Sequence, residues 1–102
     1  MAKIIWSPKA ITELDRICDF ISENSEYYAR LFAENVLKRI EQLVLFPYSG
    51  RIVPEYNQQD LRELIYQNYR IIYRVKRGCI EIVWITHGAR LLPGDQDDIS
   101  FG

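Results

Sequence analysis

The chain has 102 residues, of which 48% are hydrophobic and 26% charged, with a formal net charge of -1 and a pI near 5.8. This balance of charge excludes a general nucleic-acid coat protein, because phosphate binding is driven by Lys and Arg. The apolar runs are shorter than the ~20 residues of a membrane span, and no secretory signal opens the chain, so we expect a cytoplasmic protein. Two cysteines are too few for a zinc site, and we expect neither a metal nor a cofactor. The length predicts one domain, residues 1–102.

A strand and a helical hairpin are predicted in the first half of the chain. Residues 3–7, "KIIWS", are apolar and β-branched, which is typical of a strand. Ser7 and Pro8 then suit the N-cap and the first position of a helix. Two apolar stripes with three- and four-residue spacing predict two helices, separated by "SENS" at 22–25, with Pro47 ending the second. The short connection makes them antiparallel neighbours with one shared apolar side.

Three antiparallel strands are predicted in the second half. The hydrophobic period changes to two at residue 61, and Arg77-Gly78 is a dipeptide typical of a two-residue hairpin turn. Residues 61–67 add a third strand through a tight turn at Gln67-Asn68. The expected fold is therefore α+β with the order β-α-α-β-β-β, an antiparallel sheet covered on one face by a helical hairpin.

The hairpin turn also predicts which side chains share a face. Placing Lys76 opposite Cys79 sets Arg70 opposite Ile85. The face expected under the helices carries Tyr69, Ile71, Tyr73, Val75, Ile80, Ile82 and Trp84, and the open face carries Arg70, Ile72, Arg74, Glu81, Val83, Ile85 and His87.

The open face is the candidate site, because basic residues concentrate on it. Opposite positions for Arg74 and Glu81 predict a cross-strand salt bridge, which leaves Arg70 as the freer cation. His87 ends the last strand on the same face. A single histidine there is more often a hydrogen-bonded end cap than a general base.

The order of elements and four motifs resemble the RelE/ParE superfamily of toxins from bacterial type II toxin-antitoxin systems. The motifs are "WSPKAITELDRICDFI", "LVLFPYSGRIVPE" (43–55), "LRELIYQNYRIIYRV" (61–75) and "IEIVWITHGAR" (80–90). The resemblance implies a toxin for plasmid stabilisation or growth control, neutralised by a cognate antitoxin. It also implies that the antitoxin lays an amphipathic helix in an apolar groove near the helical hairpin or adds a strand to the sheet edge, forming an oligomer with the toxin.

The resemblance implies two modes of toxicity. One branch of the superfamily cleaves messenger RNA in the ribosome without metal, and the ParE-like branch inhibits DNA gyrase without a recognised catalytic site. In a nuclease, Arg70 and Arg90 would flank the scissile phosphate and His87 would be the acid or base.

Other positions depart from the nuclease pattern. Leu61 and Glu63 stand where that branch has a basic pair, and Gln96 stands where it has a tyrosine. A carboxylate at 63 would repel the phosphate. "HGAR" and "PYSGRIVPE" look more like the ParE-like branch, so we favour inhibition of gyrase. A ribosome-dependent mRNA endoribonuclease and a non-toxic homologue that only binds its antitoxin are the alternatives.

For a gyrase inhibitor, the resemblance implies a rigid target-binding surface without catalytic residues. Arg51 is either a brace for its loop or a binding group. Residues 91–102 contain a Pro-Gly break and then acidic residues, which predicts a loosely packed tail. The expected target-binding residues are Arg51, Arg62, Arg70, His87 and Arg90.

Overall fold

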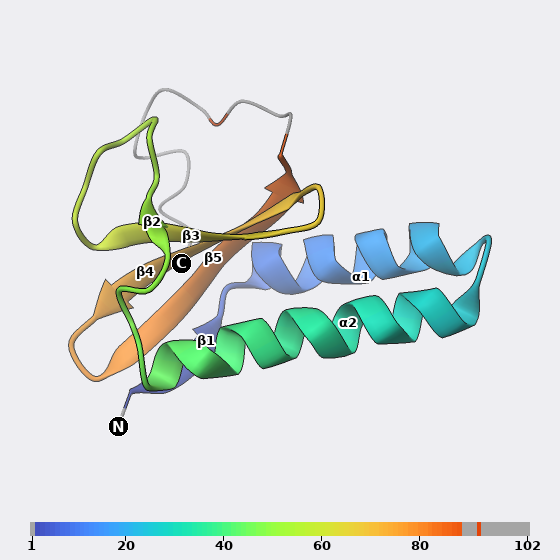
Figure 1. The fold of residues 1–102 in the computed structure, drawn as a ribbon, viewed down its shortest axis with the longest axis horizontal. Coiled ribbons are helices and arrows are strands. Elements are labelled where there is room, and N and C mark those ends of the chain that lie inside the picture. Colours follow the sequence, from blue (N-terminus) through green and yellow to red (C-terminus); the bar gives the residue numbers. More distant parts are fainter. Residues whose placement is uncertain (1, 89–91, 93–102) are drawn as a thin grey trace.

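Two helices and a five-stranded sheet form two layers in the computed structural model, which describes residues 2–88 and Leu92 (Figure 1). The elements are β1 (Lys3–Trp6), α1 (Pro8–Ser22), α2 (Glu26–Glu41), the 3₁₀ turn η1 (Gln42–Val44), β2 (Arg51–Ile52), β3 (Leu61–Tyr66), β4 (Tyr69–Lys76) and β5 (Cys79–His87). The strands lie in the order β1-β5-β4-β3-β2. The predicted α+β class with a helical hairpin on one face is confirmed. The sheet is mixed, because β1 runs parallel to β5, and the short β2 precedes the three predicted strands.

Serine side chains begin both helices. The Ser7 hydroxyl accepts a hydrogen bond from the Ala10 amide at 3.0 Å, with Pro8 in the first helical turn, as predicted. Ser25, the last residue of "SENS", accepts from the Tyr28 amide at 3.1 Å and begins α2. Within residues 2–88, neither helix is long and apolar enough to cross a membrane.

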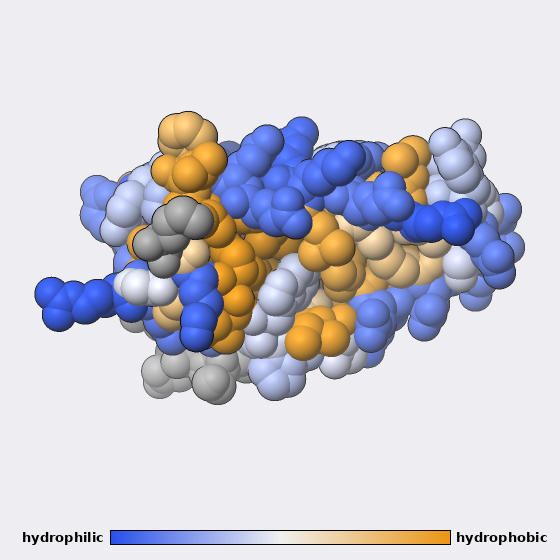
Figure 2. Space-filling view, turned by 90° about the horizontal axis from the view of Figure 1, so that it is seen from below, coloured by the Kyte–Doolittle hydropathy of each residue, from blue (hydrophilic) through white to orange (hydrophobic). Residues whose placement is uncertain are grey.

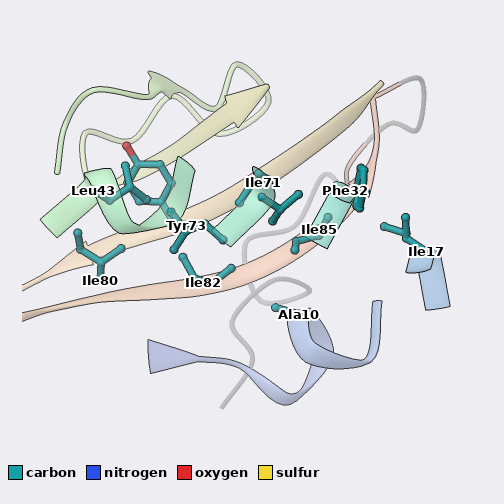
Figure 3. Close-up of a cluster of buried hydrophobic side chains, with 11 residues drawn as sticks. Ala10, Ile17, Phe32, Leu43, Ile71, Tyr73, Ile80, Ile82 and Ile85 are labelled. Atoms are coloured by element: carbon teal, nitrogen blue, oxygen red, sulfur yellow. The ribbon is translucent and has the colours of Figure 1, made fainter. Parts of the chain in front are cut away.

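The main core lies between the helices and the sheet (Figure 3). Figure 3 shows Tyr73 of β4 beside Leu43 of η1, so the core extends to the end of α2. The Tyr73 hydroxyl accepts from the Gly50 amide at 2.9 Å and donates to the Pro47 carbonyl at 2.8 Å, which ties the loop after α2 to this core. The buried members of the main core are Ala10, Ile17, Phe32, Val36, Ile40, Leu43, Ile71, Tyr73, Ile80, Ile82 and Ile85.

A β-bulge divides the β4–β5 hairpin. Near the turn the register is as predicted, with Arg74 opposite Glu81 and Tyr73 opposite Ile82. Beyond Tyr73 it shifts by one residue, so that Val83 has no opposite partner in β4. The Val83 carbonyl instead accepts a hydrogen bond from the Ser7 hydroxyl at 2.7 Å. A residue 76 positions away in the sequence therefore satisfies the extra carbonyl.

The bulge moves the far half of β5 to the opposite face from the one predicted. A one-residue shift exchanges the two faces of a strand. Ile85 lies opposite Ile71 in the main core, and Trp84 lies on the other face. His87 lies opposite Tyr69 and not on the face of Arg70. The predicted placements of Trp84, Ile85 and His87 are therefore wrong.

The face away from the helices is covered and not open, which corrects a second expectation. The connection between β2 and β3 lies on this side of the sheet (Figure 1). We call residues 53–60 of this connection the strap. Together with Leu92 it buries a second apolar cluster, which contains Val53, Leu61, Ile72, Val83, Trp84 and Leu92 with Tyr56 at its edge.

Candidate functional site

Arg70 lies at the centre of a buried ion network beneath the strap. Its side chain projects from β4, and the residue is 6% exposed. Its two terminal nitrogens donate to the Glu55 carboxylate at 2.7 and 2.8 Å, and its Nε donates to Glu63 at 2.7 Å. The expectation that Arg70 is the freer cation is wrong, because two carboxylates already hold its guanidinium.

Glu63 is the internal counter-ion of this network. It is fully buried on β3, where one carboxylate oxygen accepts from Arg70 and the other from Arg51 Nε at 2.5 Å. Since the side chain of Arg51 is 60% exposed, this arginine joins the buried network to the surface. This contact gives Arg51 the bracing role, and the binding role stays a prediction for the exposed part of its side chain. The network contains two guanidiniums and two carboxylates, so its formal charges cancel.

The network also sets the acid–base properties of its members. The hydrogen bonds from Arg70 lower the pKa of Glu55 from 4.5 to about 2, although burial opposes the shift. The same hydrogen bonds to Glu55 raise the pKa of Arg70, with a further contribution from Glu63. Folded Glu55 thus keeps its charge at a pH where the unfolded chain binds a proton.

We therefore expect acid to remove the contribution of Glu55 to stability. Because its folded pKa is depressed, that contribution is complete above the unfolded pKa of 4.5 and is lost as the pH falls toward about 2. Glu55→Gln should be less stable than the wild type at pH 7, and the difference should narrow at pH 4 and again at pH 3. Urea unfolding of both proteins at the three pH values measures this difference in the free energy of unfolding. A difference that stays constant with pH would contradict the assignment.

Arg62 and Arg74 have structural partners as well. Arg62 donates to the Gly50 carbonyl at 3.1 Å and lies over the ring of Tyr48, so it closes the loop after α2. Arg74 pairs with Asp60 at 3.1 Å. The predicted salt bridge between Arg74 and Glu81 is wrong, although the two are opposite in the register, because Lys76 pairs with Glu81 at 3.0 Å.

His87 lies apart from the network, on the other face of the sheet from Arg70. The ring of His87 contacts that of Tyr69 edge-on, with centroids 5.7 Å apart. Arg90 lies outside the described residues. Of the predicted tail, Leu92 is buried in the second cluster and its amide donates to Glu55 at 3.4 Å, and residue 91 and residues 93–102 lie outside the described part. The structure therefore joins Arg51 and Arg70, places Arg62 on the opposite face of β3 from their shared partner Glu63, and separates His87 from the network.

An apolar groove opens on the other side of the molecule, between α1, α2 and β1. It has a volume of about 250 Å³ and is lined by Trp6, Ile11, Leu14, Asp15 and Leu37. Figure 2 shows hydrophobic side chains gathered along a hollow on the side where α2 and β1 lie. Ile11 and Leu37 are 48% and 42% exposed, so the predicted shared apolar side of the helices is buried only in part. Among the described strands, β1 is also an edge strand, and its Ile5 faces solvent.

Neither the ion network nor the groove offers a set of metal ligands among its described residues. Within residues 2–88 and Leu92, no group of three or more His, Cys, Asp or Glu side chains could hold a metal ion. The ion network is internally neutral, and the groove is apolar with one carboxylate, that of Asp15. Sequence reasoning did not identify Glu55 as a partner of Arg70, and the resemblance implied an apolar groove near the helical hairpin without indicating which residues line it.

Comparison with known proteins gives consistent matches. A model of the ParE toxin of type II toxin-antitoxin systems, parDE, matches residues 4–92. The chain is 34% identical over 92 residues to Toxin RelE2 of Caulobacter vibrioides. This alignment covers 89% of this chain and 100% of that protein. Its fold is similar to a structure from the chromosomal ParDE TA system of P. aeruginosa, with a TM-score of 0.70 and 22% identity, over 85% of this chain and 96% of that one.

Proposed function

Because this chain belongs to the ParE toxin family of type II toxin-antitoxin systems, we propose that it acts in the cytoplasm by inhibiting DNA gyrase and is neutralised by a cognate antitoxin. The state of Arg70 is the observation that supports this target over messenger RNA. A metal-independent nuclease needs a cation that can meet the charge developing on the scissile phosphate. Arg70 stands where the nuclease branch has its strand arginine, and here it is buried and bound by two carboxylates.

A phosphate at this place would meet a strong electrostatic barrier. To reach Arg70 it would have to displace Glu55 from a two-point contact of 2.7 and 2.8 Å. The released carboxylate and Glu63 would then lie beside the phosphate, and like charges at close range are unfavourable. The arrangement favours a toxin that binds its target through a surface.

For the target surface we propose the β2 edge of the sheet, where Arg51 and Arg62 lie on opposite faces, with Arg90 as a third candidate. The Arg51 side chain reaches solvent from the network, and Arg62 holds the loop after α2 through the Gly50 carbonyl. Arg70 supports this surface from beneath. His87 lies on β5, with β4 and β3 between it and the β2 edge, so we propose no role for it in this contact.

Growth experiments in cells distinguish the three modes of action. Inducing the toxin without antitoxin should arrest growth and produce double-strand breaks in the chromosome, with intact transcripts. New 5' ends in translated messenger RNA and an intact chromosome would establish the nuclease instead. Normal growth at the same protein level would identify a non-toxic homologue.

For the antitoxin we propose the apolar groove beside β1. Its lining suits an amphipathic helix that presents aliphatic side chains to Ile11 and Leu37. The free edge of β1 offers an additional strand position for the same antitoxin chain, and the two chains would form an oligomer. Asp15 is the one charged side chain in the lining, so a Lys or Arg beside the aliphatic anchors would complement it.

Charge in the groove should weaken the complex with the antitoxin. Leu37→Glu is expected to cost at least about 2 kcal/mol of binding free energy, or roughly 30-fold in Kd, because it places a carboxylate against an apolar anchor. Leu45→Glu is the matched control, since Leu45 is 69% exposed and lies outside the groove lining. Calorimetry with the purified antitoxin measures both. Equal losses for the two variants would exclude the groove as the binding site.

A further inference from the structure

Two segments that are distant in the sequence meet on the face of the sheet away from the helices. Val53 and Tyr56 of the strap pack with Leu92 over Ile72 and Trp84. The backbone hydrogen bonds of Val53, Tyr56 and Asn57 stay within residues 53–61. At the ends of the strap, Val53 donates to the Leu61 carbonyl of β3 and the Asp60 carbonyl accepts from the Val75 amide of β4, so between these ends the described strap contacts the sheet through its side chains.

Glu55 links the two segments to each other and to the sheet. One of its carboxylate oxygens accepts from Arg70 at 2.7 Å and from the Leu92 amide at 3.4 Å, and the other accepts from Arg70 at 2.8 Å. Arg70 is fixed in turn by Glu63 of β3. A single carboxylate thus receives hydrogen bonds from the sheet and from the chain that follows β5.

We propose that Glu55 and Arg70 form a latch that positions the strap and Leu92 as one unit over the sheet. Opening the latch uncovers the apolar surface around Trp84 and leaves the rest of the fold intact. The main core supports this separation, because it lies on the opposite face of the sheet, between the helices and residues such as Tyr73 and Ile85. Arg70 is then a positioning residue for the strap and not a ligand for a target.

The two tryptophans of the chain allow a direct test. Trp6 lines the groove and Trp84 lies under the strap, so Trp6→Phe leaves Trp84 as the single fluorescent reporter in the full chain. In this background Glu55→Gln should raise acrylamide quenching of Trp84 several-fold. It should also accelerate hydrogen exchange of the Leu92 amide at least tenfold, while the amides of α2 and β4 stay protected.

Two further variants serve as controls. Asp60→Asn removes the ion pair with Arg74, at the end of the strap, and should change neither signal. Leu92→Ala keeps the latch and removes an apolar contact, so it should increase the quenching of Trp84 when Glu55 is intact. The proposal is overturned if Glu55→Gln leaves Trp84 shielded and Leu92 protected. It is equally overturned if the amides of α2 and β4 lose protection by the same factor as the Leu92 amide, because the strap would then open only when the whole chain unfolds.

A functional consequence rests on the proposed inhibition of gyrase. Arg51 shares Glu63 with Arg70, so a released strap should disturb the surface that carries Arg51. Glu55→Gln should lower inhibition of gyrase several-fold while antitoxin binding in the groove is unchanged. Unchanged inhibition by a variant with an open latch would exclude this link. If the wild type does not inhibit gyrase, the proposed target is wrong, and fluorescence and exchange still decide on the latch.

Discussion

Arg70→Ala is expected to lower the free energy of unfolding by about 3 to 5 kcal/mol, the cost of removing one partner from a buried ion pair. The substitution leaves Glu55 of the strap and Glu63 of the sheet with Arg51 as the remaining cation of the network. An unpaired buried carboxylate is costly because it has lost water without gaining a partner. A domain of this size has about 5 to 15 kcal/mol of stability in total, so the variant should be close to unfolding.

The matched control for Arg70 is Arg74 on the same strand. Arg74 pairs with Asp60, which is half exposed, so Arg74→Ala should cost less than about 1 kcal/mol. The triple variant Arg70→Met, Glu55→Gln, Glu63→Gln should recover part of the loss, because no buried charge is left without a partner. Urea unfolding of the purified chains measures all three. If Arg70→Ala and Arg74→Ala cost the same, the buried network does not have the energetic role assigned to it.

The second large effect is expected at Gly50. A Cβ at this position would lie 2.5 Å from the Glu63 carbonyl oxygen and 2.7 Å from the Tyr73 hydroxyl. The first atom belongs to the backbone of β3 and the second to a fully buried side chain, so neither can move freely. Gly50→Ala should therefore cost about 3 kcal/mol, at the upper end of the range for overpacking.

A double-mutant cycle separates this clash from a general effect of alanine. Tyr73→Phe removes one of the three atoms that the new methyl group would meet and leaves the Glu63 carbonyl oxygen and, at 2.9 Å, the ring carbon Cε1, so its combination with Gly50→Ala should cost less than the sum of the single changes. Gly78 is the control, because its added Cβ would meet no atom within 4 Å and its cost comes from a φ of +77°. Gly78→Ala should lose about 1 to 2 kcal/mol through the backbone alone, with no coupling to Tyr73. Additive effects of Gly50→Ala and Tyr73→Phe would show that the close approach does not matter.

Local patterns were sufficient for most of the fold. The Ser7-Pro8 pair determined where α1 begins, and Arg77-Gly78 determined the turn and the first pairs of the last hairpin. These signals act between near neighbours in the chain. Together with the four motifs they identified the superfamily, which the comparisons confirm.

The face of each residue beyond the bulge could not be predicted from the hairpin alone. The bulge occurs where the Val83 carbonyl bonds to Ser7, and alternation along β5 contains no sign of a partner so far away. Trp84 and His87 were misplaced for this single reason. The error had placed His87 on the face of Arg70, and the bulge removes it from the candidate site.

The partners of Arg70 differ in how far the sequence signals them. Glu63 lies two positions after the buried Leu61 on β3, so strand alternation places both side chains on the same face. A carboxylate on a buried face needs a cation nearby. That signal was present and was missed. Glu55 lies in a loop, 15 positions before Arg70, and reaches it only because the strap folds back over the sheet. No periodicity predicts such a contact.

Purified DNA gyrase and the antitoxin-free toxin provide the most direct measurement of the proposed function. Supercoiling of relaxed plasmid should be inhibited with trapped DNA breaks, and adding the antitoxin should restore it. The same toxin preparation, added to a reconstituted translation mixture, should leave the messenger RNA intact. Cleaved messenger RNA with unaffected supercoiling would contradict the account, because Arg70 would then have to leave its two carboxylates to act on a phosphate.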